Sequence, residues 1–317
     1  MQKIIIAGTG PMFAHIVSAA VGAGTFPVAV LRHEKVRVNP FLLFFKDIFA
    51  PSREKSFING YNLKELDVTS LNSEKFAKFL KQNNIDVVFV ASWSEKIHPE
   101  ILKIPKAGFI NIHPSLLPAY RGANPYARVI LNNESKTGVT FHLMDENLDT
   151  GAILLQKEVP VFPEDNGITL RGRCADAAKT LMIQMLDMLD NSMIFPVNQN
   201  EKKASYFPQI DISETILDFK NSSAENILRK IRAFTPWAKT YIPFKSSFFT
   251  FLSSKKSPCS FENFQPGSIV EISRNSFTIV CADNVALTFS GVKKLGLNLF
   301  FTNLYMKYLV KCGDCAI

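Results

Sequence analysis

The chain lacks any long hydrophobic run. A helix that crosses a bilayer needs about 20 consecutive apolar residues, and the longest candidate, residues 41–45, is followed at once by Lys46 and Asp47. The N-terminus also lacks the charged, apolar and small-residue regions of a secretory signal, and it reads as a first strand. We therefore expect a cytoplasmic protein with no membrane partner.

Cysteine is scarce, with five in 317 residues, which suits reduced thiols in that compartment. Cys312 and Cys315 have C-x-x-C spacing, but without a second pair this favours a frayed tail over redox or metal chemistry. No second histidine stands at ligand spacing from His98 or His142, so we expect structural or surface roles for both and predict no metal site. The glycine fingerprint of dinucleotide-binding proteins is also incomplete, because Phe13 stands in place of its third glycine, which argues against a nicotinamide cofactor.

Charged residues are moderate in number and unevenly distributed along the chain. With 20% charged and 47% hydrophobic residues, the composition is that of a folded globular protein rather than a disordered one. The net charge is +8, and basic residues exceed acidic ones in residues 31–64 and in residues 206–317. These two regions are where a polyanion could bind, and a solvated surface without a partner is the alternative.

Length and patterning predict two domains, because 317 residues exceed the usual single core. In the first, apolar runs alternate with helical patterns, which predicts an α/β fold with a doubly wound, mostly parallel sheet. Beyond residue 240, short β-rich runs separated by turns predict a small barrel. We place the first domain at residues 1–190, a linker at residues 191–207 and the second domain at residues 208–317.

The most informative stretch of the chain covers residues 111–151. Asn111 and His113 lie two residues apart at the end of an apolar run that predicts a strand, so their side chains point to the same face. Pro114 ends this strand, which places both side chains at its C-terminal end, where open α/β sheets bind ligands. Asp149 follows in a second polar segment. An amide, an imidazole and a carboxylate in this order predict one catalytic site.

These segments resemble a known family. Asn111-Ile-His113, Ser-Leu-Leu-Pro at residues 115–118, Arg121-Gly122 and Leu-Asp-Thr-Gly at residues 148–151 are similar to the catalytic domain of the 10-formyltetrahydrofolate-dependent formyltransferases. The resemblance continues in residues 216–219 and 231–237, which are similar to the start of that family's C-terminal domain. It implies a formyltransferase-type Rossmann-like first domain that carries the catalysis, and an OB-like second domain. It also implies 10-formyltetrahydrofolate as co-substrate and no metal.

Formyl transfer suggests a role for each of the three residues. An amine attacks the formyl carbonyl, an oxyanion forms, and a proton leaves the attacking nitrogen. Asn111 suits donation to the oxyanion, because a neutral amide cannot lose its donor by ionisation. His113, with an ordinary pKa near ~6.5, can donate to the oxyanion or act as acid and base. Asp149 would orient the imidazole or relay the amine's proton through water, and the sequence leaves this choice open.

The resemblance also implies the residues that surround these three. The predicted cofactor-binding residues are Ser92, Trp93, Ser115, Leu116, Leu117, Pro118, Gly138, Val139 and Thr140. The predicted substrate-binding residues are Arg121, Gly122, Thr150 and Gly151, in which the glycines permit close approach of a ligand. For Arg121, an ion pair with Asp145 or Glu146 is the alternative.

The sequence leaves two classes of formyl-group acceptor open, a charged tRNA and an amino-sugar nucleotide. The similarity is greatest to the members that formylate initiator methionyl-tRNA, and the basic regions suit an RNA partner. The alternative acceptor is an amino sugar on a nucleotide, because residues 119–125, with Tyr120, resemble sugar-directed members, and residues 32–64 lack a glycine- and lysine-rich loop. A non-catalytic relative that binds RNA or folate is a third hypothesis, and the intact set of Asn111, His113 and Asp149 argues against it. No obligate protein partner is indicated.

Overall fold

The computed structural model describes residues 2–33, 52–245, 247–259, 261, 263–273, 275–297 and 302. The apolar run at residues 41–45, most of the basic insertion, Cys312 and Cys315 lie outside the described residues. The chain divides into two compact units. The first comprises Met1–Val129, Glu134–Phe162 and Thr169–Gln209, and the second comprises Ile130–Asn133, Pro163–Ile168 and Ile210–Ile317. The domain boundaries given above stay a prediction, although residues 191–207 fall in a stretch grouped with the first unit.

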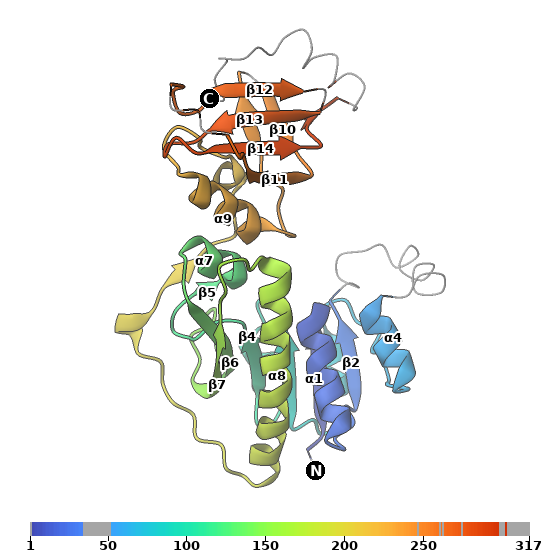
Figure 1. Cartoon of the computed structure of the whole chain (residues 1–317). Helices are drawn as coiled ribbons and strands as arrows, with labels where there is room; N and C mark the ends of the chain where they lie inside the picture. Colours follow the sequence, from blue (N-terminus) through green and yellow to red (C-terminus); the bar gives the residue numbers. More distant parts are fainter. Residues whose placement is uncertain are drawn as a thin grey trace. The chain divides into compact units, whose positions relative to one another are not determined.

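A mixed β-sheet forms the centre of the first unit (Figure 1). Among the described residues it has six strands in the order β2-β1-β3-β4-β6-β7. The first four strands of this order pair in parallel, and β6 and β7 join them antiparallel. The bounds are β1 (Ile4–Gly8), β2 (Ala29–Arg32), β3 (Val87–Ala91), β4 (Phe109–His113), β6 (Lys136–Leu143) and β7 (Ile153–Pro160). The predicted doubly wound, mostly parallel sheet is confirmed.

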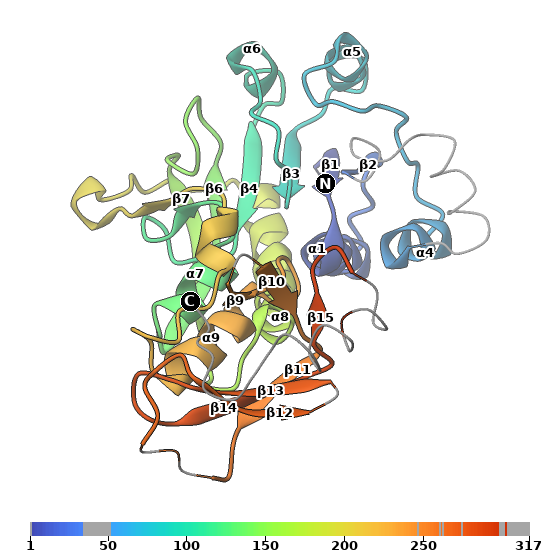
Figure 2. The ribbon, with the colours of Figure 1, turned by 90° about the horizontal axis from the view of Figure 1, so that it is seen from above.

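Helices cover both faces of this sheet, which explains why its strands read as continuous apolar runs. Every residue of β1, β2 and β3 is buried. Figure 2 shows α5 and α6 on one side of the sheet and α1 and α8 on the other. The helices are α1 (Gly10–Gly22), α4 (Arg53–Gly60), α5 (Glu74–Gln82), α6 (Pro99–Leu102), α7 (Pro125–Leu131) and α8 (Gly167–Asp190). A strand buried on both faces has no polar side to alternate with, which is typical of parallel sheets.

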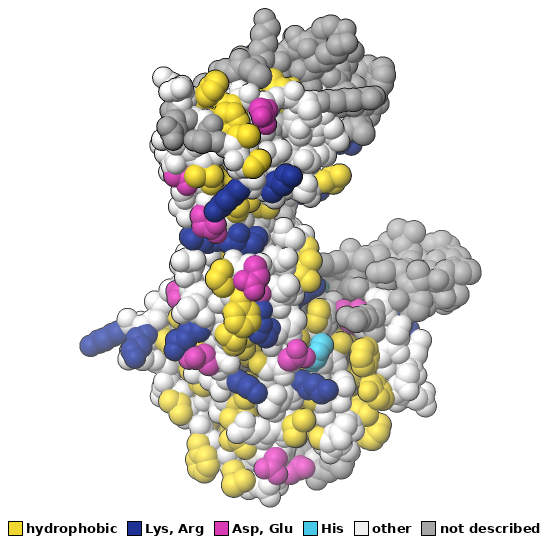
Figure 3. Space-filling model, in the orientation of Figure 1, with side chains coloured by type: hydrophobic (Ala, Val, Ile, Leu, Met, Phe, Trp, Pro, Cys, Tyr) yellow, Lys and Arg dark blue, Asp and Glu magenta, His cyan; other side chains and the backbone are white. Residues whose placement is uncertain are grey.

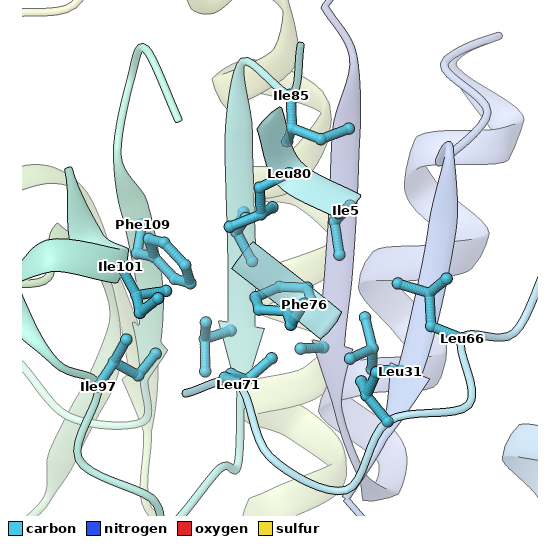
Figure 4. Close-up of a cluster of buried hydrophobic side chains, with 14 of the residues drawn as sticks. Ile5, Leu31, Leu66, Leu71, Phe76, Leu80, Ile85, Ile97, Ile101 and Phe109 are labelled. Carbon is cyan, nitrogen blue, oxygen red and sulfur yellow. The ribbon is translucent and has the colours of Figure 1, made fainter. Parts of the chain in front are cut away.

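The core between the sheet and α5 is shown in Figure 4. Phe76 and Leu80 lie four residues apart on one face of α5 and pack against Ile5 and Leu31 from the first two strands. Phe76 is completely buried, and burying a phenylalanine contributes about 1.5–3 kcal/mol by transfer alone. The side chain of Ser73 accepts a hydrogen bond from the backbone N–H of Phe76, which caps the helix at its start. This core fixes the sheet that carries the candidate site.

The second unit is antiparallel and β-rich, as predicted. Its described strands form one sheet in the order β15-β10-β9 and another in the order β11-β14-β13-β12. Among its described residues, one buried cluster contains five phenylalanines, which are Phe219, Phe244, Phe249, Phe277 and Phe289. The elements are η2 (Ile212–Thr215), α9 (Ala224–Phe234), β9 (Ile242–Phe244), β10 (Ser247–Thr250), β11 (Ser253–Lys256), β12 (Ile269–Ser273), β13 (Ser276–Val280), β14 (Ala286–Ser290) and β15 (Lys293–Lys294).

In the part of the chain that the structure describes, no helix combines the length and the apolar character that are needed to cross a membrane.

Candidate active site

Strand β4 carries Asn111 and His113 at the carboxyl end of the parallel strands. Their side chains share one face because they lie two residues apart in a strand. β4 pairs antiparallel with β6, which sets His142 opposite Asn111 and Thr140 opposite His113. His113 is 5% exposed, His142 2% and Thr140 0%. The end of β4 therefore forms a buried polar patch in an otherwise apolar sheet.

Asp149 reaches this patch from the connection between β6 and β7. Its Oδ1 accepts a hydrogen bond of 3.2 Å from Nδ2 of Asn111 and lies 3.5 Å from Nδ1 of His113. Its Oδ2 accepts a hydrogen bond of 2.9 Å from the backbone N–H of Gly122. The three residues that we predict to be catalytic thus meet at one carboxylate, and their catalytic roles stay a prediction.

The backbone of Asp149 adopts a conformation that is costly for a residue other than glycine. Its φ is 58°, in the left-handed region, which costs about 1–3 kcal/mol and persists only where neighbouring contacts hold it. Gly122 holds the side chain, and Nε2 of Gln199 donates to the backbone carbonyls of Asp149 at 2.9 Å and Gly151 at 2.8 Å. The carboxylate is therefore fixed through both its side chain and its backbone.

Asp149 is ionised throughout the neutral pH range. Burial by itself would raise the pKa of this carboxyl, but the nearby His113 and His142 and the hydrogen bond from the N–H of Gly122 lower the pKa to about 2. A buried negative charge next to an imidazole can stabilise the imidazolium or accept a proton through water.

The surroundings of His113 act on the pKa of its ring in opposite directions. Burial lowers the pKa of His113 below its ordinary value, while the charge of Asp149 and the carbonyl of Tyr120 act in the opposite direction. Nε2 of His113 lies 2.8 Å from that carbonyl oxygen, and Nδ1 faces the carboxylate. Both ring nitrogens thus face acceptors, so the doubly protonated ring satisfies both and the neutral ring only one. Such a ring is suited to exchanging a proton with a substrate.

Asn111 uses its amide hydrogens within the protein. Nδ2 lies 3.1 Å from Nε2 of His142 and 3.2 Å from Oδ1 of Asp149. Nδ1 of His142 lies 2.8 Å from the carbonyl of Leu143 and donates to it in the neutral ring, which leaves Nε2 as the acceptor for Asn111. Asn111 can therefore point a hydrogen at a substrate oxygen only when one of these two hydrogen bonds opens.

The turn after β4 is held by a compact hydrogen-bond network. Oγ1 of Thr140 donates to the carbonyl of Ser115 at 2.6 Å and accepts from the backbone N–H of Leu117 at 3.2 Å. Nε2 of Gln156 donates to the carbonyl of Leu117 and to Thr140, both at 2.8 Å. The hydroxyl of Ser115 donates to the carbonyl of Ala119 at 2.7 Å. Ser115, Leu117 and Thr140 thus shape the turn that we predict to bind folate, with polar atoms directed to the turn itself.

Four further predicted residues lie in or beside the same turn. A Cβ at Gly138 would lie 2.3 Å from Cδ2 of Leu116, so only glycine leaves room for that side chain. Val139 is completely buried in β6. The carbonyl of Pro118 accepts a hydrogen bond of 3.2 Å from the backbone N–H of Ser205. Leu116, Pro118, Gly138 and Val139 therefore belong to the packing of the turn, and a contact with folate stays a prediction.

Ser92 and Trp93 follow β3, which neighbours β4 in the sheet. Ser92 has φ 59°, which turns the chain sharply at the strand's end. The indole N–H of Trp93 donates to Oε2 of Glu95 at 3.2 Å, and its ring meets the ring of His33 edge-on at 4.6 Å between centroids. Because β3 and β4 run parallel, this loop lies at the same end of the sheet as His113. The indole is fixed at that end of the sheet, and its contact with folate stays a prediction.

Arg121 is buried and its guanidinium is paired, but with partners other than those considered from the sequence. Nε and a terminal nitrogen donate to Oε1 of Gln199 at 3.1 and 2.7 Å, and the two terminal nitrogens donate to Glu201 at 2.9 and 2.7 Å. Asp145 instead accepts a hydrogen bond of 2.7 Å from Oγ1 of Thr150. The partners of Arg121 come from residues 197–207, which lie within the segment 191–207 that the sequence suggests as a linker.

The remaining predicted substrate residues are glycines in close contacts. Gly122 has φ 93°, and a Cβ there would lie 2.3 Å from the carbonyl oxygen of Phe207. A Cβ at Gly151 would lie 1.8 Å from the carbonyl oxygen of Leu143. Both positions therefore exclude a side chain, because a Cβ contact under 3.0 Å cannot be accommodated without a shift of the backbone.

Two side chains in the site were not among the predicted site residues. For His142 we expect a structural or surface role, yet it contacts both Asn111 and Asp149, with Nε2 3.6 Å from the carboxylate. Its two-residue spacing from Thr140 in one strand is a signal that could have placed it there. Gln199 carries no comparable signal, because its partners lie 48 or more positions away in the sequence. Among the described residues, no group of three or more His, Cys, Asp or Glu side chains could hold a metal ion.

Comparison with known proteins gives one consistent result. The family model described as "Formyl transferase" matches residues 4–186, and that described as "Formyl transferase, C-terminal domain" matches residues 209–299. The chain is 34% identical to the methionyl-tRNA formyltransferase of Caldicellulosiruptor saccharolyticus over 275 residues, 85% of this chain and 86% of the relative. It is 31% identical to the methionyl-tRNA formyltransferase of Lachnospira eligens over 322 aligned positions, 99% of this chain and 100% of the relative.

A solved structure matches as well. The N-formyltransferase from Helicobacter canadensis, in complex with folinic acid and dTDP-3-aminofucose, aligns with a TM-score of 0.64 and 22% identity, covering 92% of this chain and 99% of that chain. At this identity the likeness establishes the shared fold.

Proposed function

Because this chain belongs to the formyl transferase family, we propose that it transfers the formyl group of 10-formyltetrahydrofolate to the amine of methionyl-tRNA. The family is enzymatic and uses 10-formyltetrahydrofolate as its one-carbon donor. The observation that carries the choice of acceptor is the similarity to methionyl-tRNA formyltransferases at 31% identity over 99% of the chain. The aligned region includes the second unit as well as the first unit, which carries the candidate site. Initiator tRNA is the proposed form of the acceptor, and the cytoplasm the proposed location.

The three converging residues can support this reaction. The acceptor amine attacks the formyl carbon, a carbon–nitrogen bond forms, and the bond between the formyl carbon and the folate nitrogen breaks. When the formyl group binds, one hydrogen bond of Asn111 and one of His113 open, and the freed N–H groups donate to the oxyanion that develops on the formyl oxygen. A donor of this kind is worth ~3 kcal/mol. The attacking amine loses one proton, which passes through Asp149 or His113 to the departing folate nitrogen.

The charge of the second unit supports an RNA acceptor. Figure 3 shows Lys and Arg side chains over α9 and β11. These elements carry Arg229 and Arg232 on the helix and the exposed Lys255 and Lys256 on the strand. Glu225 pairs with Arg232 at 3.0 Å and with Lys256 at 3.7 Å, and so offsets part of this charge. The excess of cations suits a phosphate backbone, whose binding releases counterions.

An amino-sugar nucleotide is the second candidate acceptor. The observation that favours it is Tyr120, whose ring stacks on Phe207 at 5.2 Å between centroids and whose hydroxyl donates to Glu134 at 2.6 Å. This tyrosine precedes Arg121 in the segment that resembles sugar-directed members. The solved N-formyltransferase in complex with dTDP-3-aminofucose also shares the fold over 92% of this chain.

One assay separates the two acceptors. The purified chain is incubated with 10-formyltetrahydrofolate and either methionine-charged initiator tRNA or a panel of dTDP-linked 3- and 4-amino sugars. We expect formylmethionyl-tRNA to form at least a hundredfold faster than any formylated sugar. Formylation of a sugar nucleotide alone would reject the tRNA proposal. Methionine-charged elongator tRNA in the same assay tests the preference for the initiator.

A further inference from the structure

A segment distant in sequence crosses over both loops of the candidate site. We call residues 197–207 the strap. Val197 bridges to Ile153 at the start of β7. At the other end β8 (Tyr206–Phe207) pairs in parallel with β5 (Arg121–Gly122). Between these ends, the backbone N–H of Tyr120 donates to Oγ of Ser205 at 2.8 Å. The strap is therefore joined to the strand that follows Asp149 and to the turn that follows His113.

Gln199 is the residue of the strap that reaches the catalytic loop directly. Its Oε1 accepts two hydrogen bonds from Arg121, at 3.1 and 2.7 Å. Its Nε2 donates to the backbone carbonyls of Asp149 at 2.9 Å and Gly151 at 2.8 Å. All four hydrogen bonds have good lengths, and both ends of the amide are used. One side chain thus connects a buried cation to the loop that carries the carboxylate.

We propose that Gln199 is a positioning residue for formyl transfer, which holds the Asp149 loop so that the carboxylate stays against His113. This inference rests on the proposed function of the site. Asp149 adopts φ 58°, a conformation that needs external contacts to persist, and the carbonyl of Asp149 is the backbone group that Gln199 binds. The other hydrogen bonds to this residue, from Asn111 and from the N–H of Gly122, act on the side chain alone.

The chemistry of the position requires an amide. Arg121 offers only donors, and the carbonyls of Asp149 and Gly151 offer only acceptors. The side-chain amide of glutamine meets both needs, because its oxygen accepts from Arg121 and its nitrogen donates to the two carbonyls. A glutamate would keep the contact with Arg121 but bring an oxygen against two carbonyl oxygens, and a methionine of similar length would bind neither side. Displacement of a reacting group by about 1 Å can cost ~100-fold in rate.

Two variants and one matched control test this role. Gln199→Glu and Gln199→Met remove the hydrogen bonds to the loop, whereas Glu201→Gln changes the other partner of Arg121 and leaves the loop contacts in place. We measure kcat, the KM for 10-formyltetrahydrofolate and the pH dependence of kcat with the acceptor that the wild-type chain uses. Thermal melting is followed for each variant. We expect kcat to fall 10- to 100-fold in both Gln199 variants, with a change in KM under threefold.

The pH profile distinguishes positioning from a general loss of structure. Among the described residues, Asp149 and His142 are the titratable groups that act on His113, and Asp149 raises the pKa of that ring. If the carboxylate of Asp149 moves away from His113, the pKa of His113 falls. The limb of the pH profile that reports on His113 then moves to lower pH, whichever protonation state of the ring is active. We expect this shift in Gln199→Glu and Gln199→Met and an unmoved limb in Glu201→Gln.

The outcomes separate the two proposals. A wild-type chain that formylates neither acceptor would overturn the proposed function and the role of Gln199 with it. An active wild type, with Gln199 variants that keep kcat within threefold and an unmoved limb, would overturn the role of Gln199 alone. Failure of both variants to fold would assign Gln199 a structural role and would also overturn the proposal.

Discussion

Replacement of Asp149 by asparagine tests the electrostatics of the site most directly. The substitution keeps the shape of the side chain and removes its charge. In the folded chain the pKa of Asp149 is about 2, against an ordinary value of 3.8. Each unit corresponds to about 1.36 kcal/mol, so the ionised carboxylate contributes about 2 kcal/mol to the free energy of unfolding at neutral pH.

The pH dependence of that contribution has a defined sign. Because the pKa is lower in the folded state than in the unfolded chain, the contribution is fully present above pH 3.8 and is lost as the pH falls through about 2. The asparagine variant has no such dependence at this position. The difference in stability between wild type and Asp149→Asn should therefore be about 2 kcal/mol at pH 7 and should shrink between about pH 4 and pH 2.

The effect on catalysis follows from the same contact. Without the carboxylate, the burial of His113 lowers the pKa of that ring further, and the proton path loses an acceptor. We expect kcat to fall about 10²- to 10⁴-fold, the range that proton transfer by a positioned group contributes. Urea unfolding at pH 7 and pH 2.5, together with formyl-transfer kinetics, measures both effects. Asp176→Asn, at a carboxylate that is 73% exposed on α8, is the control and should change neither quantity appreciably. Unchanged stability at pH 7 together with a kcat within threefold of wild type would refute the reasoning.

Three further outcomes are expected. His113→Ala should lower kcat about 10²- to 10⁴-fold and leave the equilibrium affinity for the folate donor within about threefold, since the ring acts on the reacting group; equal losses of kcat and affinity would contradict this. Phe76→Ala should reduce the free energy of unfolding in urea by about 3–5 kcal/mol because the ring is completely buried, whereas Phe79→Ala, at a half-buried position of the same helix, should cost less. Binding of methionyl-tRNA should weaken as salt rises, and the double variant Lys255→Gln and Lys256→Gln should reduce the slope of log affinity against log salt by about 1.5–2; an unchanged slope would place the RNA elsewhere.

The sequence predicted the architecture where local pattern is sufficient. The strands β1 to β4 are short apolar runs bounded by turns and helices, and a strand covered on both faces has that pattern whatever its neighbours are. The same reasoning placed Asn111 and His113 at the end of β4. The register between β4 and β6 was not predictable, because it depends on which strands meet. That register is what sets His142 opposite Asn111.

Many of the contacts that assemble the site are hydrogen bonds to backbone groups, which a sequence does not reveal. Asp149 is held by the backbone N–H of Gly122, His113 faces the backbone carbonyl of Tyr120, and Gln199 binds two backbone carbonyls. A backbone group is present at every position, so no residue type marks the positions that supply such contacts. The polar side chains of the reaction could thus be identified from their types and order, whereas the strap that holds them could not. The strap lies in the connection that follows α8. The entropy of loop closure changes little with loop length, so the length of this connection does not indicate where its residues make contact.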